Sequence, residues 1–266
     1  MSNLELARLM LPPEITQLDP WQIEVLESEA TENILNIHRQ CGKSTIAAIL
    51  CLIRGLTLPG SLHLVVSRSF RQALETGRKV RAALIHYQAE VQRQNPDTHI
   101  ELGLLTDTRS EFELPNGSRV VCLPPEADTI RNYSAPSTVI LDEASRIPDD
   151  AYFAIRPMRL ASKHWQLWMI STPFGQRGFY HYEWQQSKSK KSKVKTWEWT
   201  IEDSLKLGRV TPQFIDEEKR KGELYFRQEF MCDFLGGTTS LFTRPELEAT
   251  LTDGTPLMPL YNLVQQ

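Results

Sequence analysis

Short apolar segments alternate along this chain with longer segments whose apolar residues recur at helical spacing. The short segments predict buried strands and the longer ones predict amphipathic helices. We expect strands at 33–38, 61–67, 111–114, 118–123, 137–141, 166–171 and 195–200. We expect helices at 20–27, 43–56, 70–93, 149–160, 177–186, 212–221 and 224–231. Because the strands are apolar and alternate with helices, the pattern predicts an α/β fold with a mostly parallel sheet and helices on both faces.

The pattern weakens near the end of the chain. Residues 236–266 carry Gly, Pro and Thr at irregular intervals and little periodicity. We therefore expect one globular domain over residues 1–240, followed by a linker or tail over 241–266.

Composition narrows the class of protein. The chain has 266 residues, of which 41% are hydrophobic, and a formal net charge of −3. A chain of this size and hydrophobic content can bury a full core, which excludes global disorder. No apolar run approaches the roughly 20 residues that span a bilayer, and the N-terminus does not resemble a signal peptide. We therefore expect a soluble, intracellular protein without a membrane partner.

The four cysteines give no sign of a metal site. No two of them stand in a Cys-x-x-Cys spacing. Neither a zinc site nor a disulfide framework is expected from such scattered positions.

A phosphate-binding loop is the strongest chemical signal. Residues 38–45 lie between an apolar strand and a helical run, and they end in Gly42-Lys43-Ser44-Thr45. This order suits a nucleotide polyphosphate, because loop N–H groups and the helix N-terminus face the phosphates, lysine bridges them and serine holds Mg²⁺. The usual pattern has a glycine five residues before Gly42, where this chain has Ile37. On this segment alone, a chance tripeptide at a helix start remains the alternative.

Two adjacent carboxylates follow another buried strand. Asp142 and Glu143 come directly after residues 137–141, at the edge where ligands bind in open α/β sheets. Asp142 can position Mg²⁺, and Glu143 can orient and deprotonate an attacking water. The alternative is a pair of solvated acids at the start of a turn, but the upstream loop favours catalysis.

For two further segments, a functional role and a purely structural one both stay open. Ser171 and Thr172 end the next apolar strand, where their hydroxyls could bind a γ-phosphate or a catalytic carboxylate, or simply begin a turn at Pro173. Gln22 precedes the loop, and its amide can both donate to and accept from adenine. An ordinary glutamine beside the half-buried Trp21 explains that position equally well.

In combination and order, these motifs resemble the ATPase motor of the large terminase subunit of tailed phages, which packages viral DNA into empty heads. The resemblance covers about residues 18–242. It is carried by Trp21-Gln22, by the loop 39–44, by a hairpin at 112–123 around Asn116-Gly117, and by segments 139–144, 171–175 and 226–234.

The resemblance implies a P-loop NTPase fold of the RecA/ASCE type, with ATP and Mg²⁺ as ligands. Lys43 and Ser44 would bind phosphate and Mg²⁺, Asp142 would bind Mg²⁺, and Glu143 would be the catalytic carboxylate. The remaining nucleotide-binding positions would be Arg39 at the γ-phosphate, Gln40, Cys41, Gly42 and Thr45 in the loop, Gln22 at adenine, and Ser171 and Thr172 in the coupling motif.

Arg131 stands where some relatives carry an arginine that reaches the ATP of a neighbouring subunit. In those relatives a glycine often follows, whereas here Asn132 follows. Such an arginine can be worth about 10³–10⁵ in rate. A solvated or structural cation is the alternative for this residue.

The implied partners are double-stranded DNA, a portal protein, a small terminase subunit and further copies of the chain in a ring on the portal. The implied location is the cytoplasm of a bacterial host. Full-length relatives continue into an RNase H-like nuclease, but this chain ends shortly after Phe242, so we expect no nuclease activity from it.

Two other functions stay open from the sequence. A helicase-like ATPase shares the glutamine and the Asp-Glu-Ala strand end, but it needs a second motor domain and usually a Ser-Ala-Thr motif rather than Ser171-Thr172-Pro173. A non-catalytic prophage remnant would bind nucleotide or partners without turnover, although Lys43, Asp142 and Glu143 are intact.

Overall fold

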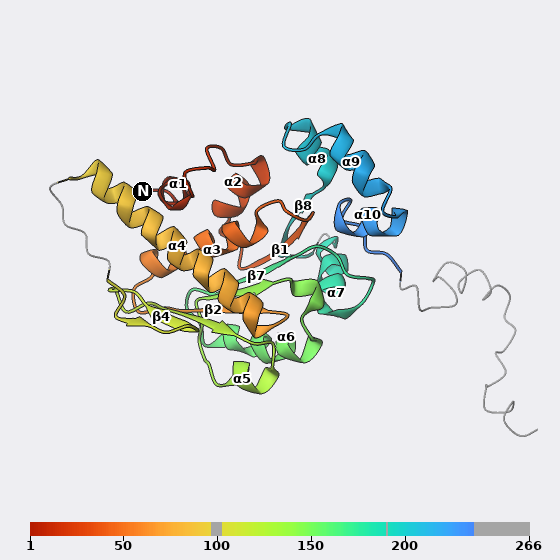
Figure 1. Cartoon of the computed structure of the whole chain (residues 1–266). Helices are drawn as coiled ribbons and strands as arrows, with labels where there is room; N and C mark the ends of the chain where they lie inside the picture. Colours follow the sequence, from red (N-terminus) through yellow and green to blue (C-terminus); the bar gives the residue numbers. More distant parts are fainter. Residues whose placement is uncertain (97–102, 190, 237–266) are drawn as a thin grey trace, which may run out of the picture.

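An eight-stranded sheet forms the centre of the computed structural model, which describes residues 1–96, 103–189 and 191–236 (Figure 1). Its strands stand in the order β3-β4-β5-β2-β6-β7-β1-β8. β4 pairs antiparallel with β3 and with β5, and every other pair is parallel. The bounds are β1 Glu32–Ile37, β2 Leu62–Ser67, β3 Thr106–Asp107, β4 Glu111–Glu113, β5 Arg119–Leu123, β6 Thr138–Asp142, β7 Gln166–Ser171 and β8 Lys195–Trp199.

Helices cover both faces of the sheet. One layer holds α1 Asn3–Met10, α2 Pro20–Leu26, α3 Lys43–Thr57 and α4 Phe70–Gln94. The other holds α5 Ala127–Arg131, η1 Ala144–Arg146, α6 Asp149–Ile155, η2 Arg156–Leu160 and α7 Gly178–Ser187. The helices α8 Ile201–Lys206, α9 Pro212–Lys219 and α10 Glu223–Glu229 follow β8 and lie together beyond the sheet edge. We call α8–α10 the helical subdomain.

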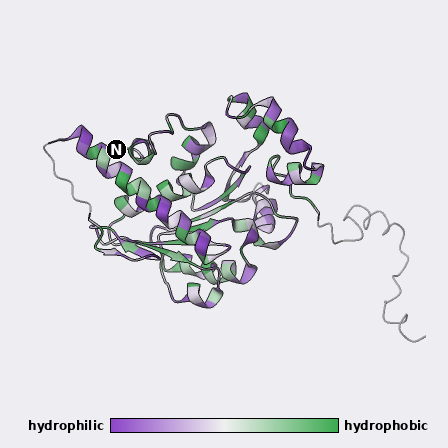
Figure 2. Ribbon diagram, in the orientation of Figure 1, coloured by the Kyte–Doolittle hydropathy of each residue, from purple (hydrophilic) through white to green (hydrophobic). Residues whose placement is uncertain are grey.

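The alternation of side chains along each strand builds two cores. In β6, Ile140 packs with α1–α4, whereas its neighbours Val139 and Leu141 pack with α5–α7. β1 divides in the same way between Leu35 and Ile34. Since successive side chains of a strand point to opposite faces, strands that are apolar throughout need a helix layer on each side. Figure 2 shows these strands as the hydrophobic centre of the ribbon.

The strand order places three strand ends side by side. β7 pairs in parallel with β6 on one side and with β1 on the other. The carboxyl ends of all three strands therefore open at the same edge of the sheet. The loop after β1, the acidic turn after β6 and the segment after β7 consequently meet at this edge.

The helical subdomain has a small core of its own but is attached to the sheet at the loop. Ile201, Ile215, Phe226 and Phe230 form that core. The N–H of His38 donates to the carbonyl of Trp199 (2.9 Å), and the N–H of Arg39 donates to the carbonyl of Glu229 (3.1 Å). Trp199 ends β8 just before the subdomain, and Glu229 ends α10. The first residues after β1 are therefore bonded both to the strand that leads into the subdomain and to its last helix.

The α/β architecture and the strands expected from the sequence are confirmed, with shifts of a residue or so at their ends. The hairpin is also confirmed, with Gly117 at φ 78° in its turn. One helix was wrong in extent: the α-helix expected over 149–160 ends at Ile155 and continues as a 3₁₀ turn. Pro157 explains the change because proline has no N–H for an α-helical hydrogen bond. The sequence analysis missed α1, α5, α8 and β3.

The expected domain boundary between residues 240 and 241 lies outside the described residues. Among the residues that are described, no helix combines the length and the hydrophobicity needed to cross a membrane.

Close packing between α4 and the sheet gives a prediction for stability. A Cβ at Gly77 would lie 2.5 Å from the Sγ of the buried Cys122. Overpacking of a core costs about 1–3 kcal/mol, while alanine regains about 1 kcal/mol of helix propensity over glycine. Because 2.5 Å is closer than a Cβ normally approaches another heavy atom, the packing cost should lie in the upper part of its range. We therefore expect Gly77→Ala to lower the free energy of unfolding by about 1–2 kcal/mol, as measured by urea denaturation.

The double variant Gly77→Ala/Cys122→Ala is the control. It removes the sulfur that obstructs the new methyl group, so the two changes should couple favourably rather than add. Wild-type stability in Gly77→Ala alone would contradict the packing argument.

Candidate nucleotide-binding site

The loop after β1 forms a turn whose backbone leaves helix α3 open at its start. Gln40 (φ 60°) and Gly42 (φ 77°) both adopt the left-handed conformation, which suits glycine but strains a residue with a side chain. Gly42 is the N-cap of α3, and no side chain caps this helix. Its first N–H groups are therefore free to bind an anion.

Lys43 is folded back over the beginning of the loop. Its Nζ donates to the carbonyls of Ile37 (2.9 Å) and His38 (2.7 Å) and to Thr172 Oγ1 (3.1 Å). Burial lowers the pKa of the Lys43 ammonium, while Cys232 and the carboxylates of Glu143 and Asp142 act in the opposite direction to a smaller extent. A buried cation with neutral partners is well suited to an incoming phosphate, since opposite charge favours its protonated form.

The two carboxylates after β6 lie in different environments. Asp142 is 5% exposed, and its Oδ2 accepts a hydrogen bond from Thr76 Oγ1 of α4 at 2.7 Å. Glu143 has a left-handed backbone (φ 60°), and its side chain, 40% exposed, lines the cavity beside Lys43. One acid is thus held rigidly at the strand end, and the other faces open space.

The end of β7 contacts both neighbouring strand ends. Ser171 Oγ accepts from the N–H of Ser145, two residues beyond Glu143 (3.1 Å). Thr172 Oγ1 accepts from Lys43 and donates to the carbonyl of Ile37 (3.2 Å). A shift at this strand end would therefore disturb contacts with the acidic turn and with the phosphate loop at the same time.

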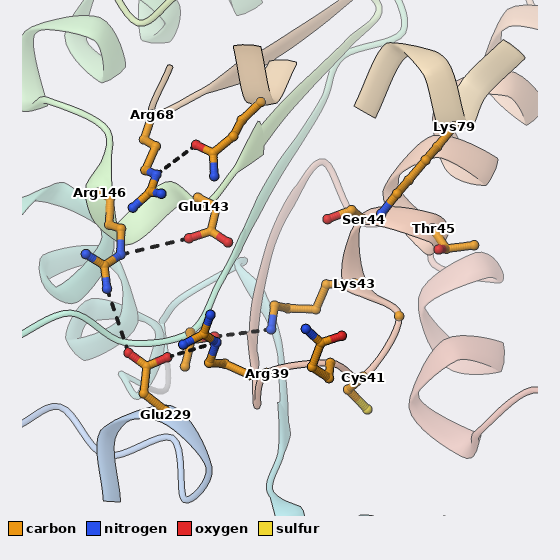
Figure 3. Close-up of a pocket in the computed structure, with 14 residues that line it drawn as sticks. Arg39, Cys41, Lys43, Ser44, Thr45, Arg68, Lys79, Glu143, Arg146 and Glu229 are labelled. Carbon is orange, nitrogen blue, oxygen red and sulfur yellow. Dashed lines mark hydrogen bonds and ion pairs between the residues drawn. The ribbon is translucent and has the colours of Figure 1, made fainter. Parts of the chain in front are cut away.

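Lys43, Glu143 and Thr172 line one cavity of about 600 Å³ (Figure 3). Ligand pockets for molecules of nucleotide size commonly have volumes of about 300–1,000 Å³. The lining residues are Arg39, Gln40, Cys41, Gly42, Lys43, Ser44, Thr45, Arg68, Gln72, Lys79, Glu143, Arg146, Thr172 and Glu229.

Nine of the thirteen residues singled out in the sequence line this cavity, and four do not: Asp142, Ser171, Gln22 and Arg131. Asp142 and Ser171 lie buried at the ends of β6 and β7, directly beside the lining residues Glu143 and Thr172. Gln22 does not line it: its Oε1 accepts from the N–H of Asp19 (2.9 Å), while its Nε2 lies against Gly42. Arg131 is exposed on α5, pairs with Asp128 at 2.7 Å, and is not among the lining residues. Cys41 lines the cavity with a thiol whose pKa is raised by burial, which disfavours a reactive thiolate.

The structure adds site residues that the sequence analysis missed. They are Arg68 and Gln72, which are hydrogen-bonded to each other, Lys79 on α4, Arg146 on η1 and Glu229 on α10. Arg146 Nε lies 3.9 Å from a Glu143 oxygen, and its Nη2 lies 3.7 Å from Glu229. Only the position of Arg146, three residues after Glu143, offered any signal in the sequence.

The available oxygen ligands fit a hard divalent cation that is coordinated partly by the protein and partly by phosphate oxygens. Asp142 offers a carboxylate, and the hydroxyl of Ser44 makes no hydrogen bond with the described residues. Within 1–96, 103–189 and 191–236, no group of three or more Asp, Glu, His or Cys could hold a metal ion by itself. Mg²⁺ commonly takes one or two protein ligands together with substrate phosphates, which matches this arrangement.

Comparisons with known proteins agree with this geometry. Residues 34–249 match the family described as terminase large subunit, T4likevirus-type, N-terminal. No match is found among curated protein sequences.

Solved structures show the same fold. The large terminase ATPase domain of Thermus phage P74-26 has a TM-score of 0.62 at 20% identity, covering 82% of this chain and 94% of that one. The large terminase of bacteriophage HK97 has a TM-score of 0.65 at 18% identity, covering 88% and 55%. A large terminase of a thermophilic bacteriophage, in complex with ADP, has a TM-score of 0.58 at 11% identity, covering 88% and 53%. The chain thus spans an isolated ATPase domain almost fully and about half of whole large terminases.

The family match extends over most of the chain and includes the loop, both carboxylates and the end of β7. The sheet order and the cavity agree with it, as do the folds of the large terminases. The chain therefore belongs to the family of N-terminal ATPase domains of terminase large subunits, the phage DNA-packaging motors.

Proposed function

We propose that this chain hydrolyses ATP with Mg²⁺ and uses the reaction to translocate double-stranded viral DNA into a prohead. The observation that carries the proposal is the meeting of Lys43, Glu143 and Thr172 at one cavity, supplied by three adjacent parallel strands. The family membership supports the same function.

The roles follow from the contacts around the cavity. The free N–H groups at the start of α3 and the ammonium of Lys43 bind the phosphates, with Lys43 exchanging the carbonyls of Ile37 and His38 for phosphate oxygens. Ser44 and Asp142 hold Mg²⁺, which neutralises charge on the phosphates when bound. Arg39, half-exposed at the rim, reaches toward the terminal phosphate.

Glu143 accepts the proton of the attacking water. Its left-handed turn directs the carboxylate into the cavity, and its partly exposed side chain leaves room for a water molecule. Ser171 and Thr172 then connect the reaction to the rest of the domain, since they contact the segment after Glu143 and Lys43 respectively.

Three assignments extend beyond the cavity of a single chain. Gln22 contacts adenine through its Nε2, which lies beside Gly42 and donates no hydrogen bond within the described residues. Arg131, exposed and outside the cavity, acts on the ATP of a neighbouring copy in a ring on the portal. A portal protein and a small terminase subunit are the further partners that the family implies, in the cytoplasm of the host.

A helicase-like ATPase is the weaker candidate. The family match and the Ser171-Thr172-Pro173 strand end both favour a packaging motor. A remnant without turnover is the remaining alternative, and the first experiment addresses it directly.

The decisive measurement is ATP hydrolysis by the purified chain with Mg²⁺, with and without linear duplex DNA. Glu143→Gln removes the proton acceptor and should lower kcat by at least about 10²-fold. It should leave ATP affinity near wild type, because the phosphate-binding groups remain. Lys43→Ala should instead weaken ATP binding itself.

Duplex DNA should stimulate the wild-type rate. Turnover in Glu143→Gln equal to wild type would contradict the assigned base. Wild-type turnover no higher than that of Glu143→Gln, across a range of protein concentrations and with DNA present, would favour the remnant.

Thr76 provides a second prediction, about Mg²⁺. Valine has nearly the shape of threonine but cannot donate a hydrogen bond to Asp142. Thr76→Val therefore removes the bond that orients the Asp142 carboxylate in the wild type. Loss of such an outer hydrogen bond typically costs about 10–100-fold in metal affinity or activity. We expect the Mg²⁺ concentration for half-maximal turnover to rise by about 10-fold.

Thr76→Ser keeps the hydroxyl and should titrate with Mg²⁺ like wild type. If Thr76→Val and wild type gave superimposable Mg²⁺ curves, the hydrogen bond would have no part in holding the ion.

A further inference from the structure

A chain of ion pairs runs from the helical subdomain to the acid after β6 (Figure 3). Arg146 lies between two carboxylates, at 3.9 Å from Glu143 and 3.7 Å from Glu229. Glu229 in turn pairs with Arg39 at 3.6 Å. Among the ion pairs of the described residues, Glu143 has no partner other than Arg146.

The guanidinium of Arg146 is held from a third side by an aromatic ring. Its central carbon lies 3.8 Å from the ring centroid of Phe174, which follows Ser171-Thr172-Pro173 after β7. A cation over an aromatic face is attracted by the ring quadrupole, and arginine is the residue most often found there. With its side chain 29% exposed, Arg146 is fixed by surroundings that come from three different parts of the fold.

Glu229 has the most buried side chain in this chain of ion pairs. Its side chain is 10% exposed, and its own carbonyl accepts the N–H of Arg39 at 3.1 Å. Phe174 and Glu229 therefore place Arg146, and Arg146 is left to place the more exposed Glu143.

We propose that Arg146 is a positioning residue that fixes the carboxylate of Glu143 for the attack of water. This inference rests on the proposed ATPase function. An ion pair of 3.9 Å between partly exposed groups adds little stability, so its effect lies in geometry. Without Arg146, the Glu143 side chain samples other rotamers, and misplacement by about 1 Å can cost about 10²-fold in rate.

A role in positioning predicts a particular kinetic signature. Arg146→Ala should lower kcat for ATP by about 10–100-fold and change KM by less than about threefold, because the groups assigned to direct phosphate contact, Lys43 and the N–H groups at the start of α3, are untouched. Arg146→Lys keeps a cation but loses the planar stack on Phe174, so it should recover part of the lost kcat.

Arg177→Ala is the matched control. Arg177 also lies over the Phe174 ring, at 5.0 Å, but it has no ion pair with Glu143 or Glu229 and does not line the cavity. Its removal should leave kcat within about twofold of wild type. A comparable loss in both alanine variants would assign the effect to packing on Phe174 and overturn the proposal.

The outcomes separate this inference from the proposed function. A wild-type chain that turns over ATP while Arg146→Ala keeps its kcat, or loses rate only through KM, overturns the positioning role and leaves the ATPase assignment standing. A wild-type rate no higher than that of Glu143→Gln overturns both. A fall in kcat at constant KM, partly restored by lysine and absent in Arg177→Ala, supports the role of Arg146.

Discussion

The parallel pairing of β6, β7 and β1 is the constraint on which the site depends. Because all three strands run in the same direction, an acid, a hydroxyl and a phosphate loop far apart in sequence open at the same edge. The position of β7 between the other two makes Thr172 a neighbour of Lys43 rather than a distant residue. That arrangement requires strands that are buried on both faces, and the two helix layers supply the cover.

The charged side chains that line the cavity suit a polyphosphate ligand. Five cationic side chains line it against two carboxylates; the cations are Arg39, Lys43, Arg68, Lys79 and Arg146, and the anions are Glu143 and Glu229. A cleft with such an excess attracts polyphosphate and raises its local concentration. The two carboxylates reduce mutual repulsion among the arginines while the phosphates are absent.

The sequence predicted the frame of the site better than its periphery. Asp142 and Thr172 could be found because each stands at the end of an apolar strand. Lys43 could be found because Gly42-Lys43-Ser44 lies between such a strand and a helix, and local order alone fixes where such residues lie. Glu229 and Lys79 could not be found, because only tertiary packing brings α10 and α4 to the loop. The missed helices α1 and α8 did carry local signals, since Ser2 with Glu5 and Thr200 with Asp203 form capping boxes. For Gln22, the sequence suggested a contact to adenine but not a role in capping the helix. In the structure, the one hydrogen bond that its side chain accepts is the capping bond from the N–H of Asp19.

The left-handed backbone at Gln40 and Glu143 has a consequence for the evolution of this domain. Both residues adopt a conformation that glycine would adopt at less cost, and both line the cavity. Backbone strain of this kind costs about 1–3 kcal/mol per residue and persists only where the surrounding fold imposes it. Glycine at position 143 would relieve the strain and remove the carboxylate at the same time. Selection for thermal stability alone would therefore erode this site, and the domain keeps its chemistry at the expense of part of its folding free energy.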